Sequence, residues 1–339
     1  MNSDRPIAVA GAGSIGCFVG GVLAIAGRRV ALLARPRVIR EIEDRGLRLT
    51  SFEGFDQTLA SNRLTLSEDP SILNDASTVL VTVKSADTAE IADLIAKHAP
   101  TDAVIVSLQN GVGNVAVLRE RLPGRRVLAG MVPCNVTAPA PGRYHRATSG
   151  DIVIEQDDAA TSERLSVPGL TMRASRNIDG VQWGKLLVNL NNALNALSDL
   201  PLSRQLAQHG WRRLFADQIA EGLAAIKAEG IRPVSSTPVP AGLTPHLLRL
   251  PDAIFAAILG RTMKIDPQAR ASMWEDLQRR RPTEIDYLQG VIIEIADRHG
   301  LEVPISRRVV ALIKQAEAAG NGPPKLTPEQ IRSPSALPK

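Results

Sequence analysis

The chain has 339 residues, of which 44% are hydrophobic and only 3% aromatic, and its formal net charge is +5. This length suits two domains with apolar cores. The mild positive excess suits an anionic ligand, whereas the scarcity of aromatic residues argues against a base-stacking surface, so we expect no nucleic-acid partner. The two cysteines, Cys17 and Cys134, have neither metal-ligand spacing nor a disulfide framework. We therefore expect no metal site and a reducing, cytoplasmic location.

The N-terminus runs from a short polar segment into the first predicted strand, which is not the pattern of a signal peptide. Apolar runs stay below the roughly 18 residues that a membrane-spanning helix needs. We therefore expect no membrane partner.

The first predicted strand, residues 7–10, is followed directly by a glycine-rich turn, Gly11-Ala12-Gly13-Ser14-Ile15-Gly16, and then by a helix-forming stretch. In a G-x-G-x-x-G turn the first glycine permits the tight turn, the second lets the backbone approach a pyrophosphate, and the third lets the helix pack on the strand. The helix N-terminus offers N–H groups to phosphates. A glycine turn without a ligand is the alternative. We expect cofactor binding through Gly11, Gly13, Ser14, Ile15 and Gly16.

The second predicted strand, residues 29–34, ends at arginine rather than at an acidic residue. An Asp or Glu there would hold the ribose 2′-hydroxyl of NAD, whereas a guanidinium can bind a 2′-phosphate through two hydrogen bonds. Arg35 occupies this place, and Arg37 and Arg40 follow it. The sequence therefore favours NADP(H) over NAD(H), unless these arginines are ordinary surface charges.

The remaining first half alternates apolar strands with helical segments, which is typical of a doubly wound parallel sheet. Strands are predicted over residues 78–83, 103–108 and 126–132, with a helix over 86–98 between the first two. Residues 133–142 are expected to form a loop and residues 144–155 a hairpin about Gly150. These elements predict a Rossmann-type domain over residues 1–175.

The second half has helical periodicity, which predicts an all-helical C-terminal domain over residues 176–320. Pro, Ser and Thr make residues 232–245 a predicted loop, and the Pro-rich tail, residues 321–339, is expected to be partly disordered or to lie on the surface. The fold class is thus α/β, with a sheet domain followed by a helical one. The predicted helices cover residues 179–197, 211–229, 247–260, 267–280, 283–299 and 306–319.

Two such domains would leave a cleft, and polar residues on the helices are candidates to face it. Lys185 is conspicuous because it is one of eight lysines against 32 arginines and lies in an apolar helix. Asn189 and Asn192 follow at i+4 and i+7, on the same helix face. A lysine in such surroundings can donate a proton. The alternative is a lysine that extends to water at the helix edge.

Four more residues are candidates: Ser272, Glu284, Asn110 and Lys84. Ser272 and Glu284 lie on helical segments on either side of Pro282, and Glu284 could simply complement a helix dipole. Asn110 and Lys84 directly follow predicted strands, where sheet strands meet a cofactor. Asn110 could instead be an ordinary turn residue.

Taken together, these motifs resemble the ketopantoate reductase (2-dehydropantoate 2-reductase) family over roughly residues 6–320. The resemblance rests on the glycine turn, on Arg35, and on five further segments. These segments are Val83-Lys84, Gln109-Asn110-Gly111-Val112-Gly113, Trp183-Gly184-Lys185-Leu186 with Asn189, Ser272-Met273, and Arg281-Pro282-Thr283-Glu284-Ile285-Asp286-Tyr287.

The resemblance implies NADPH-dependent reduction of a 2-keto acid, ketopantoate, to a 2-hydroxy acid in pantothenate and coenzyme A synthesis. It implies that Lys185 is the general acid and that Glu284 binds a substrate hydroxyl. Asn110, Asn189 and Ser272 match substrate or site-ordering positions, and Lys84 matches a cofactor-side lysine. The helical domain would bind the substrate and carry any homodimer contact.

The sequence departs from the family pattern at two positions where asparagine is expected, Ala193 and Ala269. Asn192 could replace the first of these asparagines if the helix carries a bulge or has lost one residue. Both departures concern the substrate end of the site, so a different 2-keto acid on the same scaffold is the nearest alternative. An NADP(H)-binding sensor without turnover is an alternative of another class, against which Lys185 and Glu284 argue.

Overall fold

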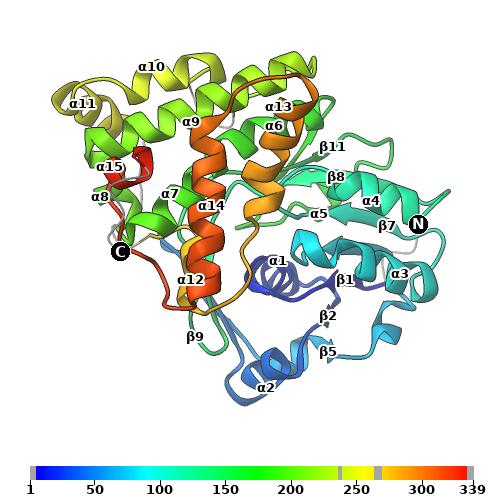
Figure 1. Ribbon diagram of the computed structural model, residues 1–339. Coiled ribbons are helices and arrows are strands. Elements are labelled where there is room, and N and C mark those ends of the chain that lie inside the picture. The colour runs from blue at the N-terminus through cyan, green and yellow to red at the C-terminus, as the bar shows by residue number, and fades with distance from the viewer. Residues whose placement is uncertain (1–4, 236–238, 263–268, 334–339) are drawn as a thin grey trace. The chain divides into compact units, whose positions relative to one another are not determined.

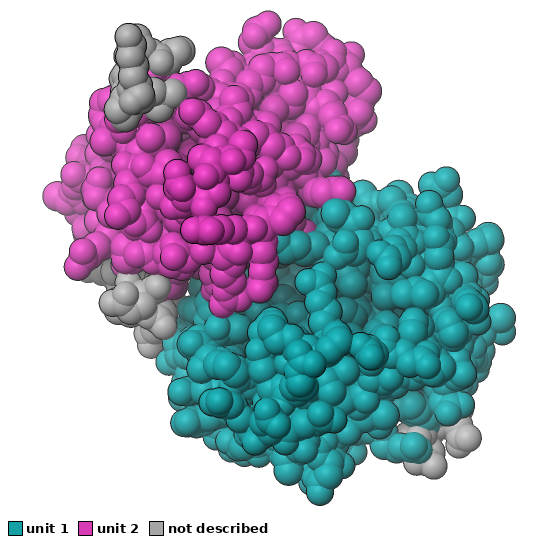
Figure 2. All heavy atoms as spheres, turned by 60° about the horizontal axis from the view of Figure 1, so that its bottom comes forward, with its two compact units in different colours: residues 1–179 teal, residues 180–339 magenta. Residues whose placement is uncertain are grey.

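The computed structural model describes residues 5–235, 239–262 and 269–333. The chain divides into two compact units, residues 1–179 and 180–339, which are coloured separately in Figure 2. Each unit is described by itself below, with the element labels of Figure 1.

An eight-stranded sheet forms the centre of unit 1, in the order β12-β11-β8-β7-β6-β1-β2-β5 (Figure 1). All neighbours from β5 to β8 are parallel, and the order reverses at β1 and β6, as in a doubly wound dinucleotide-binding sheet. Every residue of β1, β6, β7 and β8 is buried, which explains their unbroken apolar runs. The predicted Rossmann-type sheet is confirmed. The strands are β1 (Ile7–Ala10), β2 (Val30–Leu33), β5 (Thr65–Ser67), β6 (Thr78–Val81), β7 (Val104–Ser107), β8 (Val127–Met131), β11 (Ile152–Glu155) and β12 (Met172–Ser175).

A second, four-stranded sheet belongs to the same unit, in the order β4-β3-β10-β9. It consists of β3 (Leu47–Ser51), β4 (Asp56–Leu59), β9 (Val136–Ala140) and β10 (Arg143–Arg146). The predicted hairpin about Gly150 is wrong, because β10 pairs with β9 and β3 whereas β11 pairs with β8 and β12. The predicted loop over residues 133–142 is wrong in part, because it contains β9. Local β character marks a strand but does not identify its partner, which here lies about a hundred residues away.

Helix α1 (Ser14–Ile25) packs against β1 and β2 of the large sheet and against β3, β9 and β10 of the small one. Its glycines permit this double contact. A Cβ on Gly20 would lie 2.8 Å from Leu32 Cδ2, and a Cβ on Gly21 would lie 2.6 Å from Leu47 Cδ2. The helix is therefore buried on all sides from Gly16 to Ala24. The other helices of the unit are α2 (Pro36–Arg45), α3 (Thr88–His98), α4 (Asn114–Arg121) and α5 (Thr161–Leu165).

Every described element of unit 2 is helical, which confirms the predicted helical domain. Of the helices that the structure describes, none has the length and apolar character needed to cross a lipid bilayer. The predicted helix over 267–280 begins outside the described residues. The helices are α6 (Ile178–Asn189), α7 (Asn191–Ser198), α8 (Leu202–Ala207), α9 (His209–Ala228), α10 (Thr244–Leu248), α11 (Asp252–Thr262), α12 (Ser272–Gln278), α13 (Val291–Arg298), α14 (Pro304–Ala319) and α15 (Pro328–Arg332).

Several segments of unit 2 differ from the predicted elements. The single helix expected over 247–260 is wrong, because α10 ends at Leu248 and α11 begins at Asp252. The single helix expected over 179–197 is interrupted at Leu190, between α6 and α7. The helix expected over 283–299 begins with a π-helical segment, η5 (Asp286–Gly290), before α13. The tail contains α15, which starts with a capping box at Thr327 and buries Ile331 completely.

Candidate active site

Two of the three motif glycines are required by the fold itself. Gly11 has φ +96°, and a Cβ there would lie 2.3 Å from Val83 Cγ1. A Cβ on Gly16 would lie 2.6 Å from Thr82 Oγ1 and 2.9 Å from the Gly11 carbonyl oxygen. Side chains at these positions would force β1, β6 and α1 apart, whether or not a ligand binds.

Gly13 is different, because nothing in the described protein requires a glycine there. It is exposed, its φ is −84°, and a Cβ would approach no heavy atom closer than the Gly11 carbonyl oxygen at 4.0 Å. Gly13 is the N-cap of α1 and provides no side-chain cap, while the first N–H groups of an α-helix have no acceptor within the helix. An open backbone surface at a helix N-terminus fits a pyrophosphate. A glycine turn without a ligand would not need Gly13.

The turn lies at the point where the strand order reverses. The Thr82 amide donates to Ala10 O at 3.0 Å, and the Thr82 hydroxyl donates to Gly11 O at 2.7 Å. The turn after β1 and the loop after β6 therefore lie side by side at the reversal of the strand order, which is where doubly wound sheets bind ligands. Lys84 follows in the β6 loop, half-buried, as the N-cap of a 3₁₀ turn over Ser85–Asp87.

Arg35 is the residue at which the chain leaves β2 and enters α2. It is exposed, with extended backbone, and is the N-cap of α2. Arg37 forms an ion pair with Glu41 one turn later, and Arg40 is exposed. Arg35 is therefore the exposed cation at the end of the second strand, where the sequence predicts a ligand for the 2′-phosphate.

A buried amide and hydroxyl network joins the loops after β6 and β7, which the sequence alone did not reveal. Gln109 Nε2 donates to Val83 O at 3.2 Å and to the Thr88 hydroxyl at 2.8 Å. Asn114 Nδ2 donates to Asn110 O at 2.8 Å. Gln109, Thr88 and Asn114 are each at most 6% exposed. They fix the loop that carries Asn110. Gln109 closely follows the buried strand β7, whereas Thr88 and Asn114 are the first residues of α3 and α4.

In unit 2, α6 carries Lys185 and Asn189. Lys185 is half-buried and Asn189 is 6% exposed. Gly184 has a packing role, because a Cβ there would lie 1.7 Å from Val234 O, where the segment after α9 crosses α6. Asn192 lies on α7, beyond the interruption at Leu190, and is half-buried.

Ser272 is the first residue of α12 and is exposed, while the residue before it is anchored to α7. The Ala271 amide donates to Asn195 Oδ1 at 2.9 Å, and Asn195 is completely buried. Asn195 was missed in the sequence, although it lies one turn after Asn191 in an asparagine-rich stretch. Ser272 is thus held beside the helix that carries Asn192.

Asp199 provides a second anchor for the same segment. Its Oδ1 accepts a hydrogen bond from Trp274 Nε1 at 2.6 Å, and its carbonyl oxygen accepts one from Arg270 at 2.6 Å. The Arg270 guanidinium also lies 4.3 Å from the centre of the Trp274 ring system. The start of α12 is therefore fixed on both sides of Ser272.

Glu284 lies two residues before the π-helical segment η5 and is half-buried. Gln289, inside η5, is completely buried, and its Nε2 donates to Leu190 O at 2.8 Å. This bond joins the segment that follows Glu284 to the residue that follows Asn189. The structure thus links the η5 segment to the α6–α7 junction, and the α12 segment to α7 and to Asp199, which follows it.

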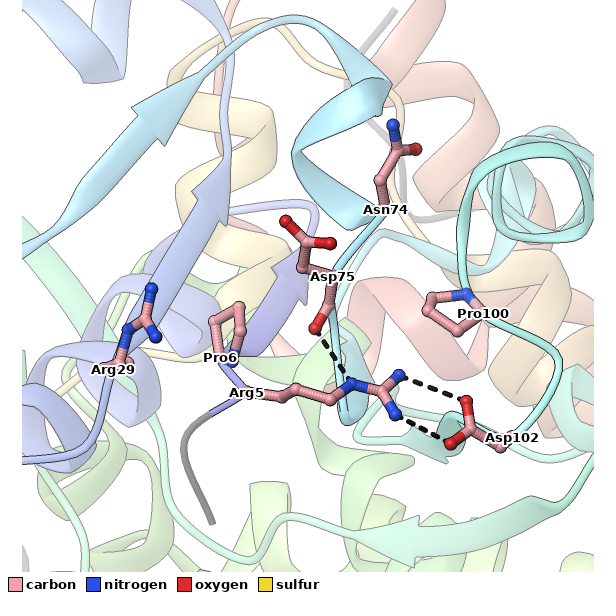
Figure 3. A pocket seen from close by; sticks show the side chains of 7 residues that line it. All are labelled: Arg5, Pro6, Arg29, Asn74, Asp75, Pro100 and Asp102. Carbon is pink, nitrogen blue, oxygen red and sulfur yellow. Dashed lines mark hydrogen bonds and ion pairs between the residues drawn. The ribbon is translucent and has the colours of Figure 1, made fainter. Parts of the chain in front are cut away.

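A surface pocket of about 380 Å³ lies at the opposite, amino ends of the sheet strands (Figure 3). Arg5 donates there to both carboxylate oxygens of Asp102, at 2.7 and 3.1 Å, and to Asp75 O. The hydrogen bonds from Arg5 lower the pKa of Asp102. The pocket is lined by two arginines and two aspartates, so its charges balance, and it is remote in the sheet from the glycine turn.

Within the described ranges, no group of three or more His, Cys, Asp and Glu side chains could hold a metal ion. Burial raises the pKa of Cys17 to about 12, so its thiol stays protonated.

Comparison with known proteins identifies the family. Residues 7–158 match the family model of ketopantoate reductase PanE/ApbA, and residues 177–317 match its C-terminal model. A 2-dehydropantoate 2-reductase of Halobacterium salinarum is 30% identical over 93% of this chain and 99% of its own length. A PanE/ApbA family ketopantoate reductase structure from Ralstonia eutropha is 32% identical, with a TM-score of 0.78, and covers 93% of this chain and 99% of that one.

A more distant structure shares the fold alone. D-mandelate dehydrogenase with NADH and anilino(oxo)acetate is 21% identical, with a TM-score of 0.75, over 93% of this chain and 99% of that one. The family models, the first relative and the sheet order all agree. The chain therefore belongs to the ketopantoate reductase PanE/ApbA family and is an oxidoreductase.

Proposed function

We propose that the protein catalyses NADPH-dependent reduction of ketopantoate to pantoate, in pantothenate and coenzyme A biosynthesis in the cytoplasm. The observation that carries the proposal is the pairing of an open Gly13 turn at the sheet reversal in unit 1 with Lys185 and Asn189 on one helix in unit 2. When bound, the reduced nicotinamide supplies the hydride that converts the keto carbon into an alcohol carbon.

Unit 1 is assigned the cofactor. The backbone of Gly11, Gly13, Ser14, Ile15 and Gly16 would hold the pyrophosphate, and Arg35 would hold the 2′-phosphate. Lys84 and Asn110, which follow β6 and β7, would order the cofactor near the substrate. NADH is the rival cofactor, because the distantly related D-mandelate dehydrogenase was crystallised with it. The exposed Arg35, with no acid in its place, supports NADPH.

Unit 2 is assigned the substrate. Lys185 Nζ donates a proton to the alkoxide oxygen as negative charge develops on it, so that hydride and proton together give the hydroxy acid. Glu284 accepts a hydrogen bond from a substrate hydroxyl. Asn189, Asn192 and Ser272 orient the remaining polar groups.

The proposal also names ketopantoate as the 2-keto acid that is reduced. Ala193 and Ala269, at the two expected asparagine positions, are 0% and 4% exposed, so small buried side chains stand there. Asn192 and Ser272, which lie near these two alanines in the sequence, are assigned the polar contacts to the substrate instead. A different 2-keto acid and a sensor without turnover are the alternatives. A homodimer formed through unit 2 remains an expectation, which light scattering on the purified protein would measure.

The test is the rate of NADPH oxidation with a panel of 2-keto acids that includes ketopantoate. We expect the highest kcat/KM with ketopantoate. A higher value with another 2-keto acid would assign that substrate instead. No oxidation with any member, in protein that binds NADPH, would leave the sensor as the explanation.

A further inference from the structure

The junction between α6 and α7 has a feature that a continuous helix would not have. Helix α6 ends at Asn189 and α7 begins at Asn191, so Leu190 interrupts the helical run just after the lysine–asparagine face. The Leu190 amide still bonds to Leu186 O at 3.0 Å. Leu190 itself keeps helical backbone angles, with φ −56° and ψ −27°, so the junction is a point within the helical run at which an outside group can bond to the backbone.

A residue 99 positions later in the chain holds it. Gln289 Nε2 donates to Leu190 O at 2.8 Å, and Gln289 is completely buried. Gln289 lies in the π-helical segment η5, and such segments occur frequently at functional sites. Glu284 lies five residues before Gln289, so a single side chain connects the lysine helix to the glutamate segment.

We propose that Gln289 is a positioning residue, which holds the α6–α7 junction so that Lys185 and Asn189 keep their orientation toward the Glu284 segment. The proposal rests on the proposed function, because it assigns Gln289 a role in placing the proton donor. It does not place Gln289 in contact with substrate.

The chain offers a closely matched control. Gln218, on α9, is also a completely buried glutamine, but in the described structure neither its Oε1 nor its Nε2 has a hydrogen-bond partner. Gln289 Oε1 likewise has no partner among the described residues. Changing either glutamine to methionine therefore preserves side-chain length, but only Gln289→Met removes a hydrogen bond.

The experiment compares Gln289→Met with Gln218→Met in steady-state reduction at saturating NADPH. We expect kcat to fall about 10- to 100-fold in Gln289→Met, the range for misplacing a catalytic group, and to stay within about 2-fold in Gln218→Met. The Kd for NADPH should stay unchanged in both. Equal kcat in the two variants would overturn the proposal.

A third variant separates the hydrogen bond from packing. Gln289→Glu can donate to Leu190 O only when its carboxyl is protonated, which burial favours. Its kcat, relative to that of Gln289→Met at the same pH, should rise as the pH is lowered from about 8 to about 5.5. A ratio that does not change with pH would contradict the role of the bond.

Hydrogen exchange of peptides over residues 186–194 provides a readout that does not depend on turnover. We expect faster exchange in Gln289→Met than in Gln218→Met. If the unmodified protein reduces no keto acid, the proposed function fails, and exchange alone then decides whether Gln289 holds the junction. Equal exchange in the two variants would overturn the positioning role on its own.

Discussion

Arg35 is an exposed cation between β2 and α2, and it is the N-cap residue of α2. We predict at least about a tenfold preference for NADPH over NADH, because one charge-assisted contact is worth about 1.5–3 kcal/mol. Arg35→Ala should abolish most of that preference, measured as the ratio of kcat/KM for the two cofactors. Arg40→Ala removes the same charge from the same helix and should leave the ratio unchanged. Equal efficiency with both cofactors in the unmodified protein would rule out this role.

Lys185 is the residue on which the proposed proton transfer depends. Lys185→Ala should lower kcat at least about 100-fold, the lower range for removing a positioned general acid. Lys185→Arg should stay nearly as slow, because a guanidinium keeps the charge but does not release a proton near neutral pH. The measurements are steady-state reduction, a thermal melt and an NADPH titration.

Lys227, an exposed lysine in the last turn of α9, provides the control. Lys227→Ala should retain normal kcat. A folded Lys185→Ala protein that binds NADPH and keeps more than about a tenth of the original kcat would exclude Lys185 as the acid.

At the scale of elements, Gly16 and Gly13 of the glycine turn should respond differently to alanine, so each variant is a control for the other. Gly16→Ala should destabilise the protein by about 1–3 kcal/mol, because its Cβ would meet Thr82 Oγ1 and Gly11 O at 2.6 and 2.9 Å. Gly13→Ala should fold with nearly unchanged stability, since its Cβ would meet nothing closer than the Gly11 carbonyl oxygen at 4.0 Å, yet should weaken NADPH binding about tenfold or more. Denaturant unfolding and an NADPH titration measure the two effects. If Gly13→Ala binds NADPH normally, the backbone there does not approach a pyrophosphate.

Local sequence predicted the large sheet well and the small sheet poorly. Strands β6 and β7 are short apolar runs buried on both faces, which is a local signal. Strand β10 is Arg-Tyr-His-Arg, of which only Tyr144 is buried, and its partners β3 and β9 are set by long-range pairing. The junction at Leu190 was missed as well, and the carbonyl there accepts a hydrogen bond from Gln289, 99 positions away.

The residues of the candidate site also fall into those that local sequence predicts and those that depend on distant contacts. Gly11, Gly13 and Arg35 could be selected from spacing, because their chemistry is local to one turn and one strand end. Asn195 and Gln289 could not, because their roles depend on bonds to residues 76 and 99 positions away. Sequence finds the groups that would touch a ligand more readily than the groups that hold them.

At the scale of the whole molecule, two half-buried carboxyl groups, Glu221 and Glu275, predict how stability changes with pH. Burial raises the pKa of Glu221 above 4.5, although its carboxylate accepts bonds from Ile305, from the Ser306 amide and from the Ser306 hydroxyl. Burial also raises the pKa of Glu275. Between the unfolded and folded pKa values the folded protein holds protons that the unfolded chain has lost. Stability contributed by these groups is therefore present below pH 4.5 and lost as the pH rises through the folded pKa.

Glu221→Gln removes one of the two groups that make stability depend on pH, while keeping a hydrogen-bond acceptor at the start of α14. We predict that its melting temperature falls less steeply than that of the unmodified protein as the pH rises from about 4.5 to about 7. Thermal unfolding across this range measures the difference. Parallel curves for the two proteins would show that Glu221 has no raised pKa in the folded state.

The burial of α1 between two sheets has a consequence for how this region tolerates variation. Most surface helices have one solvent-facing side that accepts almost any residue, so their tolerated positions recur every three to four residues. In α1 every position from Gly16 to Ala24 is buried. A saturation library of this helix, selected for folding, should therefore show no helical repeat of permissive sites. Tolerance should instead rise only toward its two ends, where Ser14, Ile15 and Ile25 are partly exposed.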